Sequence, residues 1–365
     1  MKLNVGIIGA TGYTGAELIR LIIQHPQFEV VTLTSRQEKG KQVSELYPNL
    51  RGFCDLAFTD PKDSATKAQL QSCDVIFFAT PHGVAQSTIK ELIDTHKLGK
   101  ADYEGPLMVD LSADFRIRDV SLWERYYQQE HQAVELIPHA VYGLPEVNRK
   151  AIAEAQLIAC PGCYPTSVQL GLLPLLEAGC IQTDSLIANS ASGITGAGRK
   201  AATSLLFTEN SDSFKPYSVA GHRHEPEIIQ GLGDIVRAAD ISLEDGDIQL
   251  TFVPHLIPAH RGILSTIYAR TRGAPVSYQS LFESRYQDEP FVDVLPSGSL
   301  PETRAVRGSN RLQISVTPRP EADLLVIHVA EDNLCKGASG QAIQCANIAL
   351  GLEETAGLKT PALIV

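Results

Sequence analysis

Val5-Gly6-Ile7-Ile8-Gly9-Ala10-Thr11-Gly12-Tyr13-Thr14-Gly15 decides the fold of the first half of the chain. Its apolar start at 5–8 has the composition of a buried strand, and a helical pattern follows at 16–24. A glycine-rich loop between a strand and a helix lets backbone N–H groups approach a pyrophosphate. Because the spacing is GxxGxxG, glycines that serve only a tight turn are the alternative. We expect a dinucleotide site formed by Gly9, Thr11, Gly12, Tyr13, Thr14 and Gly15.

Apolar runs alternate with helical patterns through the first half, which indicates a parallel sheet with helices on both faces. The predicted strands lie at 5–8, 29–33, 75–79 and 107–109, and the predicted helices at 16–24 and 85–92. After Cys163 the strands are longer and more alternating, as in an α+β domain with a mixed or antiparallel sheet. They lie at 249–253, 263–269, 312–316 and 324–329, before a last helix at 338–350.

Two domains are therefore predicted. Residues 1–160 form a doubly wound, Rossmann-type α/β domain for the dinucleotide, completed by residues 336–365. Residues 161–335 form a second, catalytic domain of the α+β class.

The composition is that of an ordinary globular enzyme. With 365 residues, 44% hydrophobic and 20% charged, the chain is long enough for two cores. Its formal net charge of −11 argues against nucleic acid or an acidic membrane surface as partner. No apolar run reaches the ~20 residues of a membrane span, and the N-terminus has no signal-peptide layout. Seven cysteines in such a chain fit reduced thiols, so we expect a cytoplasmic location.

The end of the second strand indicates which dinucleotide binds. An acidic residue there typically holds the ribose hydroxyls of NAD. Here the strand ends in Thr34-Ser35-Arg36, with Lys39 and Lys41 close behind. A hydroxyl and a guanidinium suit a 2′-phosphate, which a carboxylate would repel. We therefore expect NADP(H), held by Ser35 and Arg36; an ordinary solvated arginine is the alternative.

Cys163 is the strongest candidate for a nucleophile. In Ala159-Cys160-Pro161-Gly162-Cys163-Tyr164-Pro165-Thr166 an apolar run gives way to a helical pattern, which predicts Cys163 at a helix N-terminus. The N–H groups and the dipole there favour a thiolate, and a thiolate can attack an acyl carbon. Together with the glycine loop, this suggests hydride transfer to or from an enzyme-bound thioester.

Cys160 and Cys163 also form a CxxC pair. The other cysteines supply no second pair at zinc spacing, so no metal site is predicted. A thioredoxin-like pair would normally lie near the start of a small βαβ domain. We interpret Cys160 as a buried neighbour, and a peroxide-induced Cys160–Cys163 disulfide as a secondary hypothesis.

The richest candidate for acid–base chemistry is His222-Arg223-His224-Glu225-Pro226-Glu227. Pro226 suits the first turn of a helix, which places both histidines in or just before the preceding loop. A metal pair, or a structural role for one of the histidines, is the alternative.

Two further segments have the residues to bind an anion. The segment 190–200 combines hydroxyls and glycines with two cations and contains Ser192, Arg199 and Lys200. The segment 110–116 follows a strand and contains Ser112 and Arg116. A flexible surface loop and a capped loop with an internal Asp–Arg pair are the respective alternatives.

In combination, these motifs resemble the N-acetyl-γ-glutamyl-phosphate reductase family, NADPH-dependent enzymes of arginine biosynthesis. Pro-Gly-Cys-Tyr-Pro-Thr and His-Arg-His-Glu-Pro-Glu are the most specific elements, and Cys160 departs from the small or polar residue expected there. The resemblance covers nearly the full length, with motifs at 9–15, 35–36, 110–116, 142–146, 161–166, 192–200, 222–227, 254–262 and 332–337.

The resemblance implies that Cys163 is the nucleophile, that His222 is the acid–base group, and that Asn333 lies near the nicotinamide. In the implied reaction the Cys163 thiolate displaces phosphate, hydride from NADPH reduces the thioester, and His222 protonates the alkoxide and later withdraws that proton. It also implies a second domain of the glyceraldehyde-3-phosphate-dehydrogenase type and a homodimer or homotetramer. Substrate contacts are expected from Ser112, Arg116, Ser192, Arg199, Lys200, His224 and Glu227.

Three other functions are open. Aspartate-semialdehyde dehydrogenase uses the same chemistry on a shorter acyl phosphate, but the two specific motifs argue against it. A related reductase of lysine biosynthesis acts on aminoadipyl phosphate attached to an acidic carrier protein, to which a chain of net charge −11 docks poorly. A non-enzymatic NADP sensor would need no reactive thiol.

Overall fold

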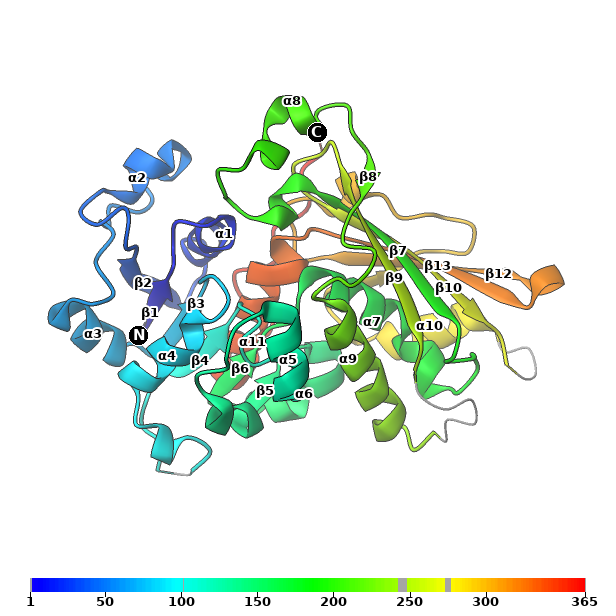
Figure 1. The fold of residues 1–365 in the computed structure, drawn as a ribbon, viewed down its shortest axis with the longest axis horizontal. Helices are drawn as coiled ribbons and strands as arrows, with labels where there is room; N and C mark the ends of the chain where they lie inside the picture. Colours follow the sequence, from blue (N-terminus) through cyan, green and yellow to red (C-terminus); the bar gives the residue numbers. More distant parts are fainter. Residues whose placement is uncertain (1, 101, 242–247, 273–276, 365) are drawn as a thin grey trace. The chain divides into compact units, whose positions relative to one another are not determined.

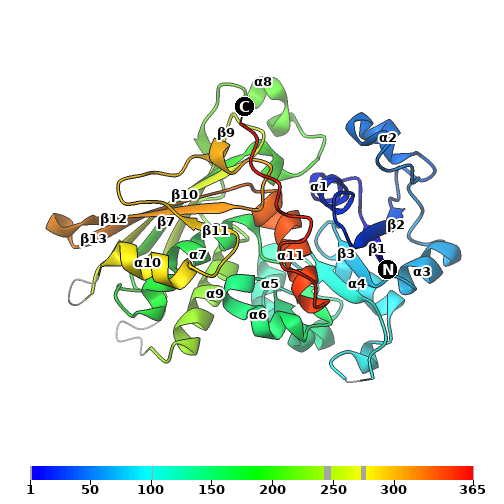
Figure 2. The ribbon, with the colours of Figure 1, turned by 180° about the vertical axis from the view of Figure 1, so that it is seen from behind.

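The computed structural model describes residues 2–100, 102–241, 248–272 and 277–364. The chain divides into two compact units, coloured along the sequence in Figure 1 and Figure 2. Unit 1 comprises Met1–Pro161 and Ala338–Lys359, and unit 2 comprises Gly162–Gly337 and Thr360–Val365. Within the described ranges, no helix has both the length and the apolar character needed to cross a membrane.

Unit 1 is built on a parallel sheet whose strands follow the order β2-β1-β3-β4-β6-β5. The strands are β1 (Leu3–Ile8), β2 (Phe28–Thr34), β3 (Val75–Phe78), β4 (Leu107–Asp110), β5 (Ala140–Tyr142) and β6 (Leu157–Ala159). The α-helices are α1 (Tyr13–Ile22), α2 (Val43–Leu46), α3 (Ser64–Gln71), α4 (Val84–Leu92), α5 (Val120–Tyr127), α6 (Pro145–Ala153) and α11 (Gly340–Ala349). This arrangement confirms the predicted Rossmann-type fold.

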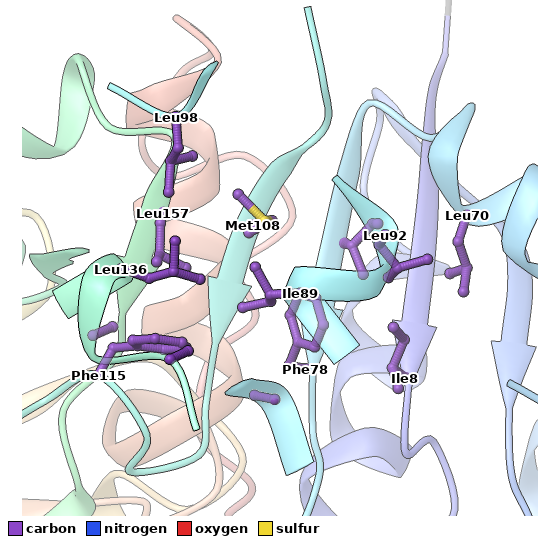
Figure 3. Close-up of a cluster of buried hydrophobic side chains, with 14 of the residues drawn as sticks. Ile8, Leu70, Phe78, Ile89, Leu92, Leu98, Met108, Phe115, Leu136 and Leu157 are labelled. Atoms are coloured by element: carbon purple, nitrogen blue, oxygen red, sulfur yellow. The ribbon is translucent and has the colours of Figure 1, made fainter. Parts of the chain in front are cut away.

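Both faces of this sheet are buried, as a parallel sheet requires. Successive side chains on a strand point to opposite faces, yet neighbours such as Phe77 and Phe78 are both fully buried. Figure 3 shows one of the two resulting cores, in which Phe78 and Met108 from the strands pack against Ile89 of α4. The last helix, α11, belongs to this unit, where it packs against α1, α6 and β4.

The predicted elements of unit 1 agree with the structure, and the differences have local causes. Helix α1 begins at Tyr13 rather than at residue 16, because Gly12 is its N-cap and the last three residues of the glycine motif are already helical. The sequence does not predict helix α5. Because this helix buries only Trp123, it shows no periodic apolar pattern.

Unit 2 is built on a mixed sheet with the order β11-β12-β13-β10-β7-β9-β8. The strands are β7 (Leu186–Gly193), β8 (Lys215–Pro216), β9 (Leu250–Ile257), β10 (Ile263–Arg270), β11 (Val292–Val294), β12 (Leu312–Arg319) and β13 (Leu324–Glu331). The α-helices are α7 (Cys163–Glu177), α8 (Phe207–Asn210), α9 (Glu225–Ala238) and α10 (Tyr278–Tyr286). The mixed pairing, with β7 parallel to β9 and antiparallel to β10, confirms the predicted α+β class.

Strand β7 corrects the interpretation of the segment 190–200. The sequence suggests an anion-binding segment there, with a flexible surface loop as the alternative, but Ser190 and Ser192 lie on a strand in the interior of the sheet. Both are buried. The small polar residues of this segment lack the β-branched and aromatic character by which a sequence indicates a strand. Its hydroxyls are paired in the core, where the Ser190 Oγ lies 2.7 Å from the Oγ of Ser265. Only the residues from Ile194 onward leave the sheet.

Helix α7 packs on this sheet at close range. A Cβ on Gly171 would stand 2.6 Å from the Cδ1 of Ile267 and 2.9 Å from the Cγ2 of Val329, so only glycine allows this approach. Pro174 inside the helix has no N–H for the carbonyl of Leu170. The hydroxyl of Tyr286 donates to that carbonyl instead. Helix α7 is therefore held along its length by the interior of unit 2.

Candidate functional site

The three glycines of the loop after β1 serve different purposes. Gly9 has a φ of 82°, and a Cβ there would stand 2.6 Å from the carbonyl oxygen of Ala79. A Cβ on Gly15 would stand 2.6 Å from the Cα of Ala10. Gly12 differs, because its φ is −79° and a Cβ would meet nothing within 4 Å. Packing thus requires Gly9 and Gly15, whereas Gly12 leaves open space at the N-cap of α1.

This geometry fits a dinucleotide pyrophosphate. The first N–H groups of α1 have no acceptor within the helix, and the missing side chain at Gly12 lets an anion approach them. The protein itself fixes the loop, since the Tyr47 hydroxyl donates to the Thr11 carbonyl at 2.7 Å and the Ser339 hydroxyl to the Thr14 carbonyl at 2.9 Å. The site is therefore shaped before any ligand binds.

Three cations follow β2, and their surroundings differ. Lys39 pairs with two carboxylates, at 2.9 Å and 3.8 Å, and Lys41 pairs with Glu38. Arg36 is exposed and takes part in no ion pair or hydrogen bond with the described residues. Ser35 is buried, and its Oγ accepts two N–H groups of the following turn. Of these cations, Arg36 is the one available to an anionic ligand.

The segment 110–116 forms an internal network at the end of β4. Asp110 accepts hydrogen bonds from the N–H and the hydroxyl of Ser112, at 2.8 Å and 2.9 Å. Asp114 accepts the N–H groups of Gly83 and Gln86, where α4 begins. Burial, followed by the charge of Asp114, raises the pKa of Asp110, and burial also raises the pKa of Asp114. The donors of Ser112 are thus used within the loop.

Arg116 is buried and anchors the end of the neighbouring strand. Its Nε donates to the carbonyl of Cys160 at 2.6 Å, and its Nη2 donates to the carbonyl of Leu111 at 2.8 Å. Arg116 therefore joins the loop after β4 to the residue that follows β6. For both Ser112 and Arg116, contact with a substrate stays a prediction.

In unit 2, helix α7 begins at Cys163, where the sequence predicts a helix N-terminus, and Gly162 is its N-cap. Cys163 is half-buried, and none of the seven cysteines is in a disulfide. The N–H groups of the first turn and the helix dipole favour a negative charge on its sulfur. The arrangement can present a thiolate.

Two residues from the start of α9 hold the turn before Cys163. Glu227 is fully buried, and its carboxylate accepts the N–H of Gly162 at 2.8 Å. The ring of His224 lies against the same glycine, where a Cβ would stand 2.5 Å from its Nε2. Glu227 and His224 therefore position the turn that carries the thiol, and no substitution with a side chain fits at Gly162.

His222 lies in the loop just before α9 with a defined protonation state. Its Nδ1 accepts the N–H of His224 at 3.1 Å, so the proton of the neutral ring is on Nε2. Burial lowers the pKa of His222 to about 4, and Arg223 acts in the same direction. At neutral pH His222 is therefore an uncharged donor through Nε2.

Two tyrosines that the sequence analysis did not single out complete the surroundings of His222. The rings of Tyr164 and Tyr217 meet the His222 ring edge-on, with centroids 5.6 Å and 5.4 Å away, and their hydroxyls lie 3.1 Å apart. Burial raises the pKa of Tyr217 to about 12 and that of Tyr164 further, and a negative charge at Cys163 adds to both shifts. Tyr164 lies in a quoted motif, but no motif marks Tyr217.

Asn333 ties the strand ends of unit 2 together. Its Oδ1 accepts the N–H of Gly262 at 2.8 Å, and its Nδ2 donates to the Oγ1 of Thr195 at 3.0 Å. The preceding Asp332 pairs with Arg261 at 3.3 Å. The amide of Asn333 thus has a structural use, and its proximity to a nicotinamide stays a prediction.

The remaining predicted residues of unit 2 separate into two groups. Ser192 is buried, and its hydroxyl donates to the carbonyl of Gly193 at 3.0 Å. Arg199 and Lys200 are exposed and follow the 3₁₀ turn Ile194–Ala197. Lys200 makes no ion pair or hydrogen bond with the described residues. Within the described ranges, no group of three or more His, Cys, Asp or Glu side chains could hold a metal ion.

Gly337, which the sequence analysis quoted without assigning it a role, packs closely against Cys163. A Cβ on Gly337 would stand 2.8 Å from the Cβ of Cys163 and 3.0 Å from the Oε1 of Glu331. Gly337 belongs to the five-residue π-helical turn Cys335–Ser339, a feature often found at functional sites.

Two family models match the chain. "Semialdehyde dehydrogenase, NAD binding domain" covers residues 4–155, and "Semialdehyde dehydrogenase, dimerisation domain" covers residues 163–333. Among curated proteins, the N-acetyl-gamma-glutamyl-phosphate reductases of Saccharophagus degradans and Cellvibrio japonicus are 56% and 55% identical to this chain. Each match covers 99% of this chain and 99% of the relative.

Solved structures share the fold at low sequence identity. Aspartate semialdehyde dehydrogenase II of Vibrio cholerae has a TM-score of 0.68 at 16% identity, and covers 96% of this chain and 99% of its own. Aspartate semialdehyde dehydrogenase of Candida albicans, solved with NADP, has a TM-score of 0.68 at 18% identity, and covers 95% and 98%. Both matches therefore extend over unit 1 and unit 2 of this chain.

Gly12 faces open space whereas Gly15 is closely packed, so substitutions at these two glycines should have opposite outcomes. Gly12→Ser keeps a favoured N-cap residue, so the temperature of unfolding stays unchanged. The new side chain blocks the approach to α1, and the Kd for NADPH rises by about tenfold or more, which corresponds to ~1.4 kcal/mol. Gly15→Ala, which has no room for its Cβ, lowers the temperature of unfolding instead. Fluorescence titration and thermal melts check both, and a Gly12→Ser variant that binds NADPH normally contradicts the assignment.

Proposed function

Because the chain belongs to the N-acetyl-γ-glutamyl-phosphate reductase family, we propose that it reduces N-acetyl-γ-glutamyl phosphate to N-acetylglutamate 5-semialdehyde. NADPH is the reductant, inorganic phosphate is released, and the reaction belongs to arginine biosynthesis. The observation that carries this proposal is Cys163 at the first position of α7, with its preceding turn held by Glu227 and His224.

Unit 1 holds NADP(H). The loop from Gly9 to Gly15 receives the pyrophosphate at the start of α1, and Ser35 and Arg36 lie where the 2′-phosphate of the adenosine would bind. The exposed guanidinium of Arg36, unlike Lys39 and Lys41, is not engaged by a carboxylate among the described residues. When bound, the cofactor supplies the hydride that reduces the acyl group.

Cys163 is the nucleophile. Its sulfur attacks the acyl carbon, the bond from that carbon to the phosphate oxygen breaks, and phosphate leaves with the electron pair, so that a thioester remains. Negative charge develops on the acyl oxygen during the attack. The N–H groups in the first turn of α7 have no acceptor within the helix and can stabilise that charge.

His222 manages the proton at the acyl oxygen. Because its Nδ1 accepts the N–H of His224, its Nε2–H is the group that donates. A neutral imidazole donor suits an oxygen that becomes an alkoxide, and the same nitrogen withdraws the proton when the aldehyde is released. Its aromatic neighbours Tyr164 and Tyr217 keep it uncharged before the substrate arrives.

The anionic substrate needs positive groups, since the chain as a whole carries a net charge of −11. Lys200 is exposed and unpaired among the described residues, which supports a contact with the substrate. We assign further substrate contacts to Arg199 and Ser192 in unit 2 and to Ser112 and Arg116 in unit 1. Asn333 lies near the nicotinamide.

His224 and Glu227 act mainly through the turn before Cys163. Both contact Gly162, so they position the thiol. Any substrate contact they make is additional to that role.

A second copy of the chain covers the open face of the unit 2 sheet. Strands β7, β10 and β13 bury alternate residues beneath α7. Their other face presents half-exposed or exposed side chains, among them Ile187, Leu264, Tyr268 and Val326. Such an apolar face supports a homodimer, or a homotetramer built from two. The seven cysteines without a disulfide support a cytoplasmic location.

Replacing Arg36 separates the two dinucleotides. Arg36→Asp removes a charge-assisted hydrogen bond and places a carboxylate beside the 2′-phosphate. We expect the Kd for NADPH to rise roughly 10- to 100-fold, which corresponds to about 1.4–2.8 kcal/mol, with little change for NADH. Titration of both dinucleotides into the variant measures this, and equal weakening of both would exclude a 2′-phosphate role.

The function is tested in the oxidative direction. The protein should oxidise N-acetylglutamate semialdehyde in a reaction that depends on both NADP⁺ and phosphate, and should turn over aspartate semialdehyde far more slowly. Cys163→Ser should nearly abolish this turnover and leave NADPH binding intact, because only the covalent step is lost. Substantial residual turnover would exclude the thioester route, and preference for aspartate semialdehyde would reassign the enzyme.

Replacing His222 removes the proton donor without removing a charge. His222→Asn should lower kcat/KM by roughly 10²- to 10⁴-fold, the usual size of an acid–base contribution. Because the pKa of His222 is about 4, the loss should be the same from about pH 6 to pH 8, a range in which the imidazole is neutral throughout. His224→Asn is the comparison, and if it shows this loss while His222→Asn does not, the two roles are reversed.

A further inference from the structure

A buried carboxylate packs against the same glycine as Cys163. Glu331 is the last residue of β13 and is fully buried. A Cβ on Gly337 would be 3.0 Å from its Oε1 and 2.8 Å from the Cβ of Cys163. The carboxylate and the nucleophilic residue therefore pack against the same glycine, with no Cβ between them.

The turn after β13 is built so that this approach is fixed. Asp332 accepts the N–H groups of Leu334 and Cys335, and its carbonyl accepts the N–H of Gly337 at 3.0 Å. Its other carboxylate oxygen accepts the N–H of Gly308. The oxygens of Asp332 thus accept backbone N–H groups, and Glu331 is the carboxylate that faces Gly337.

Two cations belong to the segments around Glu331. Arg261 pairs with the neighbouring Asp332 at 3.3 Å, and the fully buried Lys336 lies in the turn that follows β13. Buried charges persist in proteins when they are compensated in this way. A negative charge on Glu331 is therefore consistent with its complete burial.

The other titratable groups around Cys163 are either neutral or in contact with the turn at Gly162. Glu227 binds the N–H of Gly162. His222 is neutral, because burial lowers its pKa, and Tyr164 and Tyr217 are neutral, because burial raises theirs. His224 packs its ring on Gly162. Glu331 is thus a carboxylate beside the thiol that the mechanism does not yet use.

We propose that Glu331 is a positioning residue of the reaction, whose carboxylate keeps the sulfur of Cys163 basic. This inference rests on the proposed role of Cys163 as nucleophile. A helix N-terminus makes a thiolate more abundant but also less nucleophilic, because nucleophilicity falls with the pKa of the thiol. A nearby negative charge has the opposite effect on that pKa. It also favours thioester formation, which removes the charge from the sulfur.

The test is the pH dependence of Cys163 alkylation. Iodoacetamide reacts with the thiolate, and mass spectrometry of the peptide that contains Cys163 gives its rate at each pH in the full-length protein. In Glu331→Gln the midpoint of this profile should fall by about one pH unit, the size of the effect of a neighbouring charge. The plateau rate at high pH should fall about threefold, because the less basic thiolate is the weaker nucleophile.

Two further variants keep the result interpretable. Glu302→Gln neutralises a carboxylate whose side chain is 60% exposed, and its profile should match that of the wild type. Glu331→Asp keeps the charge but withdraws it by one methylene, so its midpoint should lie between those of the wild type and Glu331→Gln. It replaces Glu331→Gln if that variant does not fold.

The outcomes distinguish this inference from the function it rests on. A reactive Cys163 whose midpoint is unchanged, or raised, in the Glu331 variants overturns the role of Glu331 alone. A wild-type Cys163 that is alkylated no faster than the six other cysteines overturns the nucleophile, and the role of Glu331 with it.

Discussion

The hydrogen bond between the N–H of Gly162 and the buried carboxylate of Glu227 is the constraint on which the site in unit 2 depends. It fixes the residue at which α7 begins, and so the direction in which the Cys163 side chain leaves the helix. Gly162 and Gly337 admit no Cβ, because His224 lies on the first and Cys163 on the second. The backbone that carries Cys163 is therefore closely packed at the N-terminus of α7, where the helix dipole favours a negative charge.

The electrostatics of the site follow from this packing. A helix N-terminus favours the thiolate, while the surrounding histidine and tyrosines are kept uncharged by burial. His222 can then donate a hydrogen bond without being a cation, since its Nδ1 is occupied by a backbone N–H. A charged imidazole would instead compete with the helix terminus for the sulfur. Neutral donors put no cation beside the sulfur of Cys163, which suits its proposed attack on an acyl carbon.

In unit 1, some residues of the glycine loop are required for packing, and another leaves space for a ligand. Gly9 and Gly15 are required for packing, and Tyr47 and Ser339 hold the loop from outside. Of the three glycines in this loop, Gly12 is the one without a packing reason, which supports the proposal that a ligand binds there. In the segment 110–116, by contrast, the polar side chains of the motif have partners within the protein. Their hydroxyl and carboxylates form a network that ties β4 to α4, so the motif has a structural reason in addition to any contact with substrate.

The sequence by itself determined the two sheets, the glycine loop and the helix start at Cys163, because strand and helix periodicities and glycine spacing are local properties of the chain. It missed β7, whose small polar residues become a strand only by pairing with β9 and β10. It also could not place Tyr217 or Glu331, which lie far from Cys163 in the sequence and belong to no motif assigned a role. Their proximity, and the neutral state of His222, depend on burial and contacts that exist only once the sheet and helices of unit 2 have packed.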